Sequence, residues 1–306
     1  MSRIYEALQR ADRERAAAQG SDSTHVAEPA IAFAIDEPPP TKIEVALDKV
    51  SQYPWKPNAL SFPTLEDRGA GVEQFRGLRS RVYQARYEAA LKTVLVCSGM
   101  PGEGKSFVAA NLAMSLARNS VNNILLIDGD LRRPTLHYLL GAPNEPGLSE
   151  YLNGTAQLHQ IMQRASNPEV VESNGLRSIS NLTFISAGKC GDNASDVVAN
   201  HRIHELIATL APHFDWILID SPPVLAVTDA VELARAADGV LLVARGAVTP
   251  FDVAKRAQTA FNASRMLGFV LNDVKDAPHG EGSYYYYGGA EANNGDKPRK
   301  DNRSQS

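Results

Sequence analysis

The chain has 306 residues, of which 43% are hydrophobic and 22% are charged, so it holds enough apolar side chains to bury a large core. Its formal net charge of −4 argues against a protein that binds nucleic acid by neutralising many phosphates. Its two cysteines, Cys97 and Cys190, cannot form a disulfide framework, and the lack of a Cys-x-x-Cys motif argues against a structural zinc site.

Residues 1–18 are predicted to form a short amphipathic helix. Apolar residues recur there at i, i+3, i+4 and i+7 and make one narrow stripe, which packs either on the chain's own domain or on a partner protein. The segment is charged throughout, unlike a signal peptide. No apolar run approaches the roughly 18–20 residues of a membrane span, so we expect a soluble, cytoplasmic protein.

Residues 19–71 are predicted to be an extended Pro-rich linker. Seven of the 18 prolines fall in this stretch, and no helical periodicity survives in it. Because proline removes an amide donor and fixes φ, we expect no packed element here.

The folded core is predicted over residues 72–274. It opens with a helix at 72–91 and continues with predicted strands at 92–97, 123–128, 182–186, 216–220, 239–244 and 268–272. Between the strands the pattern predicts helices at 105–119, 201–211, 228–237 and 250–264. Runs such as ILLID and GVLLVA are apolar throughout, which is typical of strands that helices cover on both faces. The prediction is a doubly wound α/β domain with a mostly parallel sheet.

Residues 275–306 are predicted to be a flexible tail, because they hold Gly, Asn, Ser and charges with almost no aliphatic side chains. Four consecutive tyrosines, Tyr284, Tyr285, Tyr286 and Tyr287, interrupt this composition. Glycine and serine neighbours should keep this tyrosine cluster accessible. An adhesive aromatic patch or an edge strand is the structural alternative.

Residues 99–106 read GMPGEGKS, which matches the phosphate-binding pattern G-x-x-x-x-G-K-[ST] between a predicted strand and a predicted helix. Glycines let backbone N–H groups converge on phosphate oxygens, and the helix N-terminus adds a partial positive charge. The lysine is expected to reach the β- and γ-phosphates and the serine hydroxyl to bind Mg²⁺. The predicted nucleotide-binding residues are Gly99, Met100, Pro101, Gly102, Glu103, Gly104, Lys105 and Ser106.

Three aspartates stand at the carboxyl ends of two predicted strands: Asp128 and Asp130 after one, and Asp220 at the end of another. In an open α/β sheet these strand ends form the ligand crevice, so the aspartates should lie beside the phosphate-binding loop. A nucleotide with its Mg²⁺ needs anionic ligands and a proton acceptor there. Strand-end capping, or ion pairs with Arg132 or Arg133, is the structural alternative.

The order of these motifs resembles the bacterial tyrosine kinases, P-loop kinases that are close in structure to the MinD/ParA ATPases. The resemblance covers about residues 71–290 and includes DGDLR at 128–132 and DSPP at 220–223. Glu73, Arg76 and Arg79 match the E-x-x-R-x-x-R helix through which that family forms rings, although a solvated helix face is the alternative. The opening MSRIYEAL resembles the exosortase-associated, exopolysaccharide-linked branch of the family.

The resemblance also implies roles for individual residues. Lys105, Asp128 and Asp130 are the implied catalytic residues, with Asp128 as the candidate base for a tyrosine hydroxyl. Ser106, Asp128 and Asp220 are the implied Mg²⁺ contacts. Asn272 resembles the asparagine that reads adenine in related ATPases, with a turn residue as the alternative. The implied cofactors are ATP and Mg²⁺.

By resemblance, the function is that of an ATP-dependent protein-tyrosine autokinase. It would phosphorylate its tyrosine cluster in trans within a homo-oligomeric ring and regulate exopolysaccharide or capsule polymerisation and export. Many members of the family carry a fused transmembrane activator. We expect none in this sequence, so the resemblance implies a separate one, a chain-length-determinant protein, at the inner face of the cell membrane. A MinD/ParA-like positioning ATPase is the main alternative. Met100 argues against it, because those proteins usually carry lysine at this position. A non-enzymatic assembly module is the third possibility.

Overall fold

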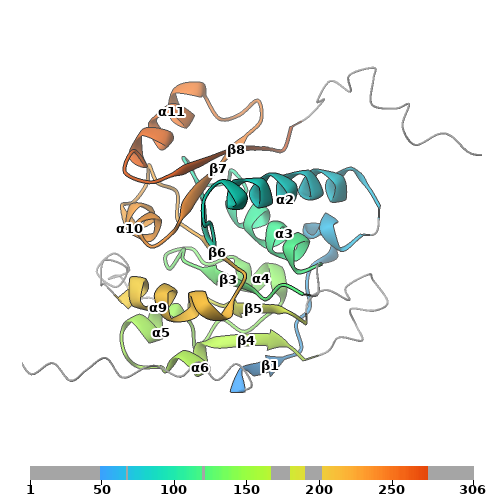
Figure 1. Cartoon of the computed structure of the whole chain (residues 1–306), viewed down its shortest axis with the longest axis vertical. Coiled ribbons are helices and arrows are strands. Elements are labelled where there is room, and N and C mark those ends of the chain that lie inside the picture. The colour runs from blue at the N-terminus through green and yellow to red at the C-terminus, as the bar shows by residue number, and fades with distance from the viewer. Residues whose placement is uncertain (1–48, 67, 119–120, 167–179, 190–201, 275–306) are drawn as a thin grey trace, which may run out of the picture. The chain divides into compact units, whose positions relative to one another are not determined.

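The computed structural model (Figure 1) describes residues 49–66, 68–118, 121–166, 180–189 and 202–274. The predicted N-terminal helix, the linker up to residue 48, Cys190, and the tail with its tyrosine cluster lie outside the described residues. Within the described ranges, no helix combines the length and the apolar character that a membrane span requires.

An eight-stranded sheet forms the centre of the described structure, in the order β1-β4-β5-β3-β6-β2-β7-β8. Neighbouring strands run parallel, except that β4 and β5 pair antiparallel. The strand bounds are β1 Ser51–Tyr53, β2 Thr93–Ser98, β3 Ile124–Asp128, β4 Met162–Ala165, β5 Leu182–Ile185, β6 Trp216–Asp220, β7 Gly239–Arg245 and β8 Met266–Asn272.

Helices cover both faces of this sheet (Figure 1). One hydrophobic core joins the sheet to α2, α3 and α4, and a second joins its other face to α5, α6, α9, α10 and α11. The helix bounds are α2 Ala70–Glu88, α3 Lys105–Ala117, α4 Leu136–Leu140, α5 Leu148–Leu152, α6 Leu158–Ile161, α9 Arg202–Leu210, α10 Asp229–Arg235 and α11 Phe251–Ala260. The predicted doubly wound, mostly parallel α/β fold is confirmed.

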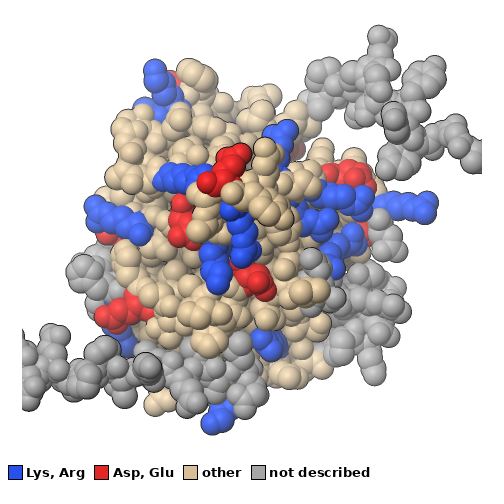
Figure 2. Space-filling model, viewed as in Figure 1, with Lys and Arg blue, Asp and Glu red and all other residues tan. Residues whose placement is uncertain are grey.

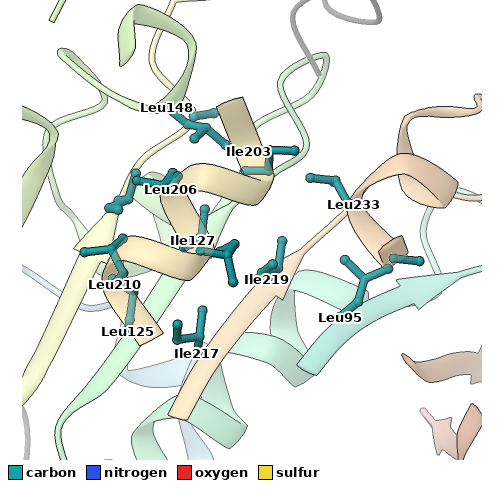
Figure 3. Close-up of a cluster of buried hydrophobic side chains, with 14 of the residues drawn as sticks. Leu95, Leu125, Ile127, Leu148, Ile203, Leu206, Leu210, Ile217, Ile219 and Leu233 are labelled. Carbon is teal, nitrogen blue, oxygen red and sulfur yellow. The ribbon is translucent and has the colours of Figure 1, made fainter. Parts of the chain in front are cut away.

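The alternation of side chains along a strand explains why the buried strands are apolar throughout. In β2, Val94 and Val96 enter the core under α3, while Leu95 and Cys97 enter the opposite core. Figure 3 shows the second core, where Leu206 and its neighbours on α9 face the aliphatic side chains of β3 and β6. Burying each such Leu or Ile side chain contributes about 1.5–3 kcal/mol.

The predicted Pro-rich linker is wrong for residues 49–66, and the folded domain begins before Val72. This segment forms β1 at the sheet edge and two 3₁₀ turns, η2 Ala59–Ser61 and η3 Pro63–Leu65. Trp55 and Phe62 are 2% and 0% exposed in the core under α2 and α3. The prolines here separate short elements, as Pro63 does at the first position of η3. Large aromatic side chains, rather than periodicity, therefore hold this segment in place.

Most remaining differences from the sequence prediction concern short or marginal elements. The strand β4 and the helices α4, α5 and α6 have four or five residues each, too few for a periodic pattern. The predicted helix 72–91 begins two residues earlier and ends at Glu88, and the predicted helix 250–264 ends at Ala260. The predicted strand 216–220 matches β6 in both bounds.

Candidate active site

A pocket of about 690 Å³ opens at the carboxyl ends of the central strands β2, β3 and β6. The phosphate-binding loop, Asp130, Arg132, Arg133, Pro222 and Pro223 are among the residues that line it. Asp128 and Asp220 are register partners on the adjacent strands β3 and β6, and β6 also pairs with β2. The topology therefore brings the three predicted aspartates and the loop to one place, as the strand-end rule requires.

The phosphate-binding loop depends on glycine at its sharpest turns. Gly102 and Gly104 have φ of +80° and +90°, a region that side chains with a Cβ disfavour. A Cβ at Gly104 would also collide with the side-chain amide of Asn272, which donates from Nδ2 to the Glu103 carbonyl at 3.0 Å. Asn272, which is predicted to bind the adenine, thus lies directly against the loop, at the end of β8.

Glu103 holds the loop from the inside, a role that its variable position in the motif did not indicate. Its side chain is buried, and Oε2 accepts the backbone N–H of Met100 at 2.7 Å. The other carboxylate oxygen accepts the Thr249 hydroxyl, which in turn accepts the Arg245 N–H at 2.8 Å. One buried carboxylate therefore joins the loop to the segment after β7.

Lys105 and Ser106, the first residues of α3, form one cluster with two of the aspartates. Lys105 Nζ lies 2.9 Å from Asp130 Oδ2 and 3.7 Å from Asp220 Oδ2. Ser106 Oγ donates to Asp220 Oδ2 at 2.5 Å. Burial lowers the pKa of Lys105, but the carboxylates of Asp220 and Asp130 raise it by more, so the ammonium stays charged.

Asp128 lies behind this cluster, fully buried, and organises the chain after β3. Its Oδ1 accepts the N–H of Asp130 at 3.2 Å, and Oδ2 accepts those of Thr135 and Leu136 at 3.2 and 3.0 Å. Burial, and then the neighbouring Asp220 carboxylate, raises the pKa of Asp128 to about 8 despite these donors. Burial also raises the pKa of Asp220, although Lys105 and Ser106 oppose the shift.

The donor set fits a magnesium ion that is bound together with a nucleotide. Asp220 Oδ1 is buried and has no hydrogen-bond partner among the described residues, and its other oxygen bonds the Ser106 hydroxyl. No group of three or more His, Cys, Asp or Glu side chains in the described ranges could hold a metal by itself. Because Mg²⁺ in such sites takes phosphate oxygens and waters as its other ligands, two protein groups are sufficient.

Comparisons with known proteins agree with this geometry. A family profile described as ParA: NUBPL iron-transfer P-loop NTPase matches residues 90–295. The tyrosine-protein kinase YwqD of Bacillus subtilis is 33% identical over 222 residues, which cover 72% of this chain and 88% of YwqD. The tyrosine-protein kinase wzc of Salmonella typhimurium is 33% identical over 218 residues, covering 71% of this chain and 28% of wzc. The kinase domain of the Escherichia coli tyrosine kinase ETK has a TM-score of 0.63 and 29% identity, covering 71% of this chain and 82% of that domain.

The chain belongs to the bacterial tyrosine-kinase family. The resemblance inferred from the phosphate-binding loop and the aspartate motifs is confirmed, and so is the P-loop NTPase fold, which implies nucleotide binding. At the level of the family, the predicted enzyme class of protein-tyrosine kinase is confirmed too. The narrower resemblance to the exosortase-associated branch stays a prediction.

In this family member, the residues predicted for the ring interface lie on α2 with different environments. Arg76 and Glu73 are exposed and form an ion pair of 2.6 Å within the helix. Arg79 instead lies against α3, where its Nη1 donates to the carbonyl of Ser115 at 2.6 Å. The interface role of all three stays a prediction.

Two arginines of the pocket were absent from the predicted site. Arg133 donates its backbone N–H to Asp130 Oδ1 at 3.0 Å, and the Arg132 side chain pairs with Asp229 at 3.0 Å. The sequence carries a signal for them, because DGDLRR places two guanidinium groups two and three positions after the second aspartate of a phosphate site. In the sequence prediction they are only possible structural ion-pair partners of the aspartates.

Proposed function

We propose that this chain is an ATP-dependent autokinase that phosphorylates its own tyrosine cluster, Tyr284–Tyr287. One observation carries the proposal: Lys105, Ser106, Asp130 and Asp220 meet within hydrogen-bond or ion-pair distance at the phosphate-binding loop. Family membership and the accessible composition around the tyrosines support it. The transfer would modify neighbouring copies in a ring, and through it exopolysaccharide or capsule polymerisation and export.

Phosphoryl transfer depends mainly on positioning and on neutralising charge. Mg²⁺, when bound with ATP, supplies charge neutralisation at the phosphate oxygens. Ser106, Asp220 and Asp128 are the residues that would hold it. Ser106 would use its hydroxyl and Asp220 the oxygen that has no described partner. Lys105 has three donors, so it can keep its bond to Asp130 and still donate to a phosphate oxygen.

Asp128 is proposed as a Mg²⁺ contact and as the base for the tyrosine hydroxyl. Its raised pKa of about 8 suits a group that exchanges a proton near neutral pH. Its carboxylate is fully buried, whereas Asp130 lines the pocket. A water or a movement of the loop after β3 would connect Asp128 to the acceptor, while Asp130 supports the phosphates and Lys105. Asn272, against the loop, is proposed to read the adenine.

The tail is long enough to deliver a tyrosine to its own site or to a neighbour's. Tyr284 is 12 residues beyond Asn272, a span of at most about 40 Å when extended. The E-x-x-R-x-x-R motif of α2, which is predicted to join copies in a ring, favours transfer to a neighbouring copy. Four phosphotyrosines would add roughly −6 to −8 charges, which the aspartates of the site would repel. Phosphorylation should therefore release the tail and open the ring.

A separate transmembrane activator, a chain-length-determinant protein, is the proposed partner, with the kinase cytoplasmic and recruited to the inner membrane face. Size-exclusion chromatography of the full chain before and after phosphatase treatment tests the ring. A larger assembly after treatment is expected, and an identical size in both states would contradict ring release.

A ParA-like ATPase that hydrolyses ATP without tyrosine phosphorylation is the second candidate, because the matching profile belongs to that group. The full chain is incubated with Mg·ATP and probed for phosphotyrosine, alongside Lys105→Met and a variant with Tyr284–Tyr287 changed to Phe. We expect phosphotyrosine in the chain without substitutions and in neither variant. Free phosphate without phosphotyrosine would support the ATPase, and neither product would support a non-enzymatic assembly role.

A further inference from the structure

A second pocket, of about 590 Å³, lies away from the phosphate-binding loop, between η3, α2 and the end of α3. Arg76 and Arg79 from α2 and Arg118 from the end of α3 line it. Figure 2 shows Lys and Arg side chains gathered over the right-hand end of α2. Its volume falls within the roughly 300–1,000 Å³ typical of small-ligand sites. We refer to it as the arginine pocket.

The arginine pocket concentrates positive charge without lining carboxylates. None of the described residues that line it is acidic. Glu73 pairs with Arg76 on the helix surface, and Glu66 is in contact with Arg118 through its backbone carbonyl. Arg79 donates to the Ser115 carbonyl at 2.6 Å. Arg118 donates to the carbonyl of Glu66, in the loop before α2, at 2.7 Å. Each guanidinium has five N–H donors, so these bonds leave donor capacity for an oxyanion.

The electrostatics of Arg79 agree with this geometry. Burial lowers the pKa of Arg79, and the positive charges of Arg76 and Arg118 lower it further against an opposing effect of Tyr83. Like charges held together around a pocket are stabilised when an anion binds between them. Phosphate oxygens fit best, because a planar guanidinium can bind two of them at once.

The lining also suits an aromatic ring next to the phosphate. Tyr83 and the buried Val72 give the pocket an aromatic and an aliphatic wall beside the arginines. Ser80 adds an exposed hydroxyl to the lining, whereas the hydroxyl of the buried Thr64 donates to Asn111 Oδ1 at 2.8 Å. Arginines beside an aromatic surface are a combination that binds an aryl phosphate such as phosphotyrosine.

The described chain ends close enough to supply that ligand. Val274 lines a groove with Gln74, Gly77 and Leu78, on the side of α2 opposite the one that forms the arginine pocket. Tyr284 is ten residues further along the chain, which span at most about 36 Å extended and about 17 Å as a flexible coil. A helix with its side chains is about 10–12 Å wide, so the tail can pass around α2.

We propose that the arginine pocket binds an aryl phosphate, and that its source is the phosphorylated tyrosine cluster of this chain's own tail. The assignment to the tail rests on the proposed autokinase function. A tail held there would cover Arg76 and Arg79, the residues predicted for the ring. Capture of the phosphorylated tail and ring assembly would then exclude each other.

The test measures binding of a synthetic peptide, residues 282–289 with all four tyrosines phosphorylated, by fluorescence anisotropy. The full-length chain is phosphatase-treated and diluted below the concentration at which it assembles. Arg118→Gln is expected to weaken binding at least fivefold, whereas Arg256→Gln, an exposed arginine on α11, should leave the affinity within twofold. Arg118 lies outside both the phosphate-binding loop and the ring motif. Equal binding by both variants would overturn the proposal.

A matched pair at one exposed position guards against a folding defect. Ser80→Glu places a carboxylate at the pocket and should weaken peptide binding at least tenfold, while Ser80→Gln, with the same shape and no charge, should stay within threefold of the unmodified chain. Equal effects of the pair would overturn the role of charge. Equally tight binding of the unphosphorylated peptide, or displacement by Mg·ADP, would overturn the site.

Inorganic phosphate is the remaining arm, and it distinguishes the source of the ligand. Phosphate should displace the labelled peptide only at concentrations at least a hundredfold higher than those at which the unlabelled phosphopeptide displaces it. Displacement at equal concentrations would overturn the assignment to the tail. Because the peptide is synthetic, binding does not depend on kinase activity. A chain that fails to form phosphotyrosine can still bind it, so the two proposals fail independently.

Discussion

Glu103 shows how one buried side chain can set the shape of a loop that is usually explained by its glycines. Its carboxylate accepts the Met100 N–H and the Thr249 hydroxyl, while Asn272 bonds its carbonyl. We expect Glu103→Gln to weaken Mg·ADP binding about tenfold, because hydrogen bonds to a charged group contribute about 1.5–3 kcal/mol. Calorimetric titration of the full chain measures this.

Thr249→Val is the control for Glu103, because it removes one of the two hydrogen bonds and leaves the carboxylate in place. Its effect on nucleotide affinity should be smaller than that of Glu103→Gln. Full affinity in Glu103→Gln, at an unchanged melting temperature, would show that the glycines alone shape the loop.

Cys97 is a second residue whose environment makes a simple prediction. It lies fully buried in β2, and burial raises the pKa of its thiol to about 12. The thiolate is the reactive form, so at pH 8 only about one thiol in ten thousand is reactive, against roughly a quarter for an ordinary cysteine. In a Cys190→Ser background, Cys97 should not react with a disulfide reagent in the folded chain.

The pH dependence gives that experiment its sign. Raising the pH from 7 to 9 ionises most of an ordinary cysteine, whose pKa is about 8.5, but leaves Cys97 almost entirely protonated. The rate at which Cys97 is labelled should therefore stay low across this pH range. Labelling should reach one thiol per chain only in denaturant. Fast labelling of the folded chain at pH 8 would contradict the burial of β2.

At the residue scale, the sequence predicted which groups meet but not their division of labour. Motif spacing brought Lys105, Ser106 and Asp220 together correctly, because strand ends and a helix start fix their positions. Spacing could not show that Asp128 lies behind the pocket while Asp130 lines it, since that depends on three backbone N–H donors after β3. Glu103 gave no signal at all, because its partner Thr249 is 146 positions away.

At the scale of elements, the segment that contains β1, η2 and η3 is expected to stabilise the fold through its buried aromatic side chains. Trp55 is 2% exposed and packs edge-on against Phe184, with ring centroids 6.1 Å apart. We expect Trp55→Ala to lower the free energy of unfolding by about 3–5 kcal/mol, the usual cost of removing a large buried aromatic side chain. Urea unfolding of the full chain, followed by circular dichroism, measures this.

Leu60 offers a matched control in the same segment, because its side chain is 95% exposed. Leu60→Ala should change the free energy of unfolding by no more than about 0.5 kcal/mol. Equal, small effects of both substitutions would mean that residues 49–66 are the linker that their prolines suggest.

The same comparison explains what sequence reasoning could and could not find among the elements. Long, continuously apolar runs gave β2, β3, β6 and β7 within a residue or so, because burial on both faces leaves an unambiguous pattern. The short β1 and β4 have no such pattern, and both pair at one edge of the sheet. Their position is set by contacts such as that between Trp55 and Gln163, 108 residues apart.

For the whole molecule, the question is whether α2 joins copies of the chain. Glu73 and Arg76 pair on an exposed surface, with side chains 60% and 47% exposed, and such a pair stabilises a single chain by only about 0–1 kcal/mol. Arg76→Glu should therefore leave the melting temperature of the monomer nearly unchanged. If α2 is the interface of a ring, the same substitution puts a negative charge at a position where a positive charge would contact the neighbouring copy. We expect it to shift the phosphatase-treated chain from a large assembly to monomers in analytical ultracentrifugation.

Arg256→Glu makes the same change of charge on α11, so it controls for the effect of net charge on self-association. It should leave the assembly intact. An unchanged distribution for Arg76→Glu would mean that α2 presents a solvated face, and that copies meet elsewhere if they meet at all. Arg79 is less suitable for this test, because its bond to the Ser115 carbonyl belongs to the packing of α2 on α3. Replacing it would change stability and assembly together, whereas Arg76 separates the two.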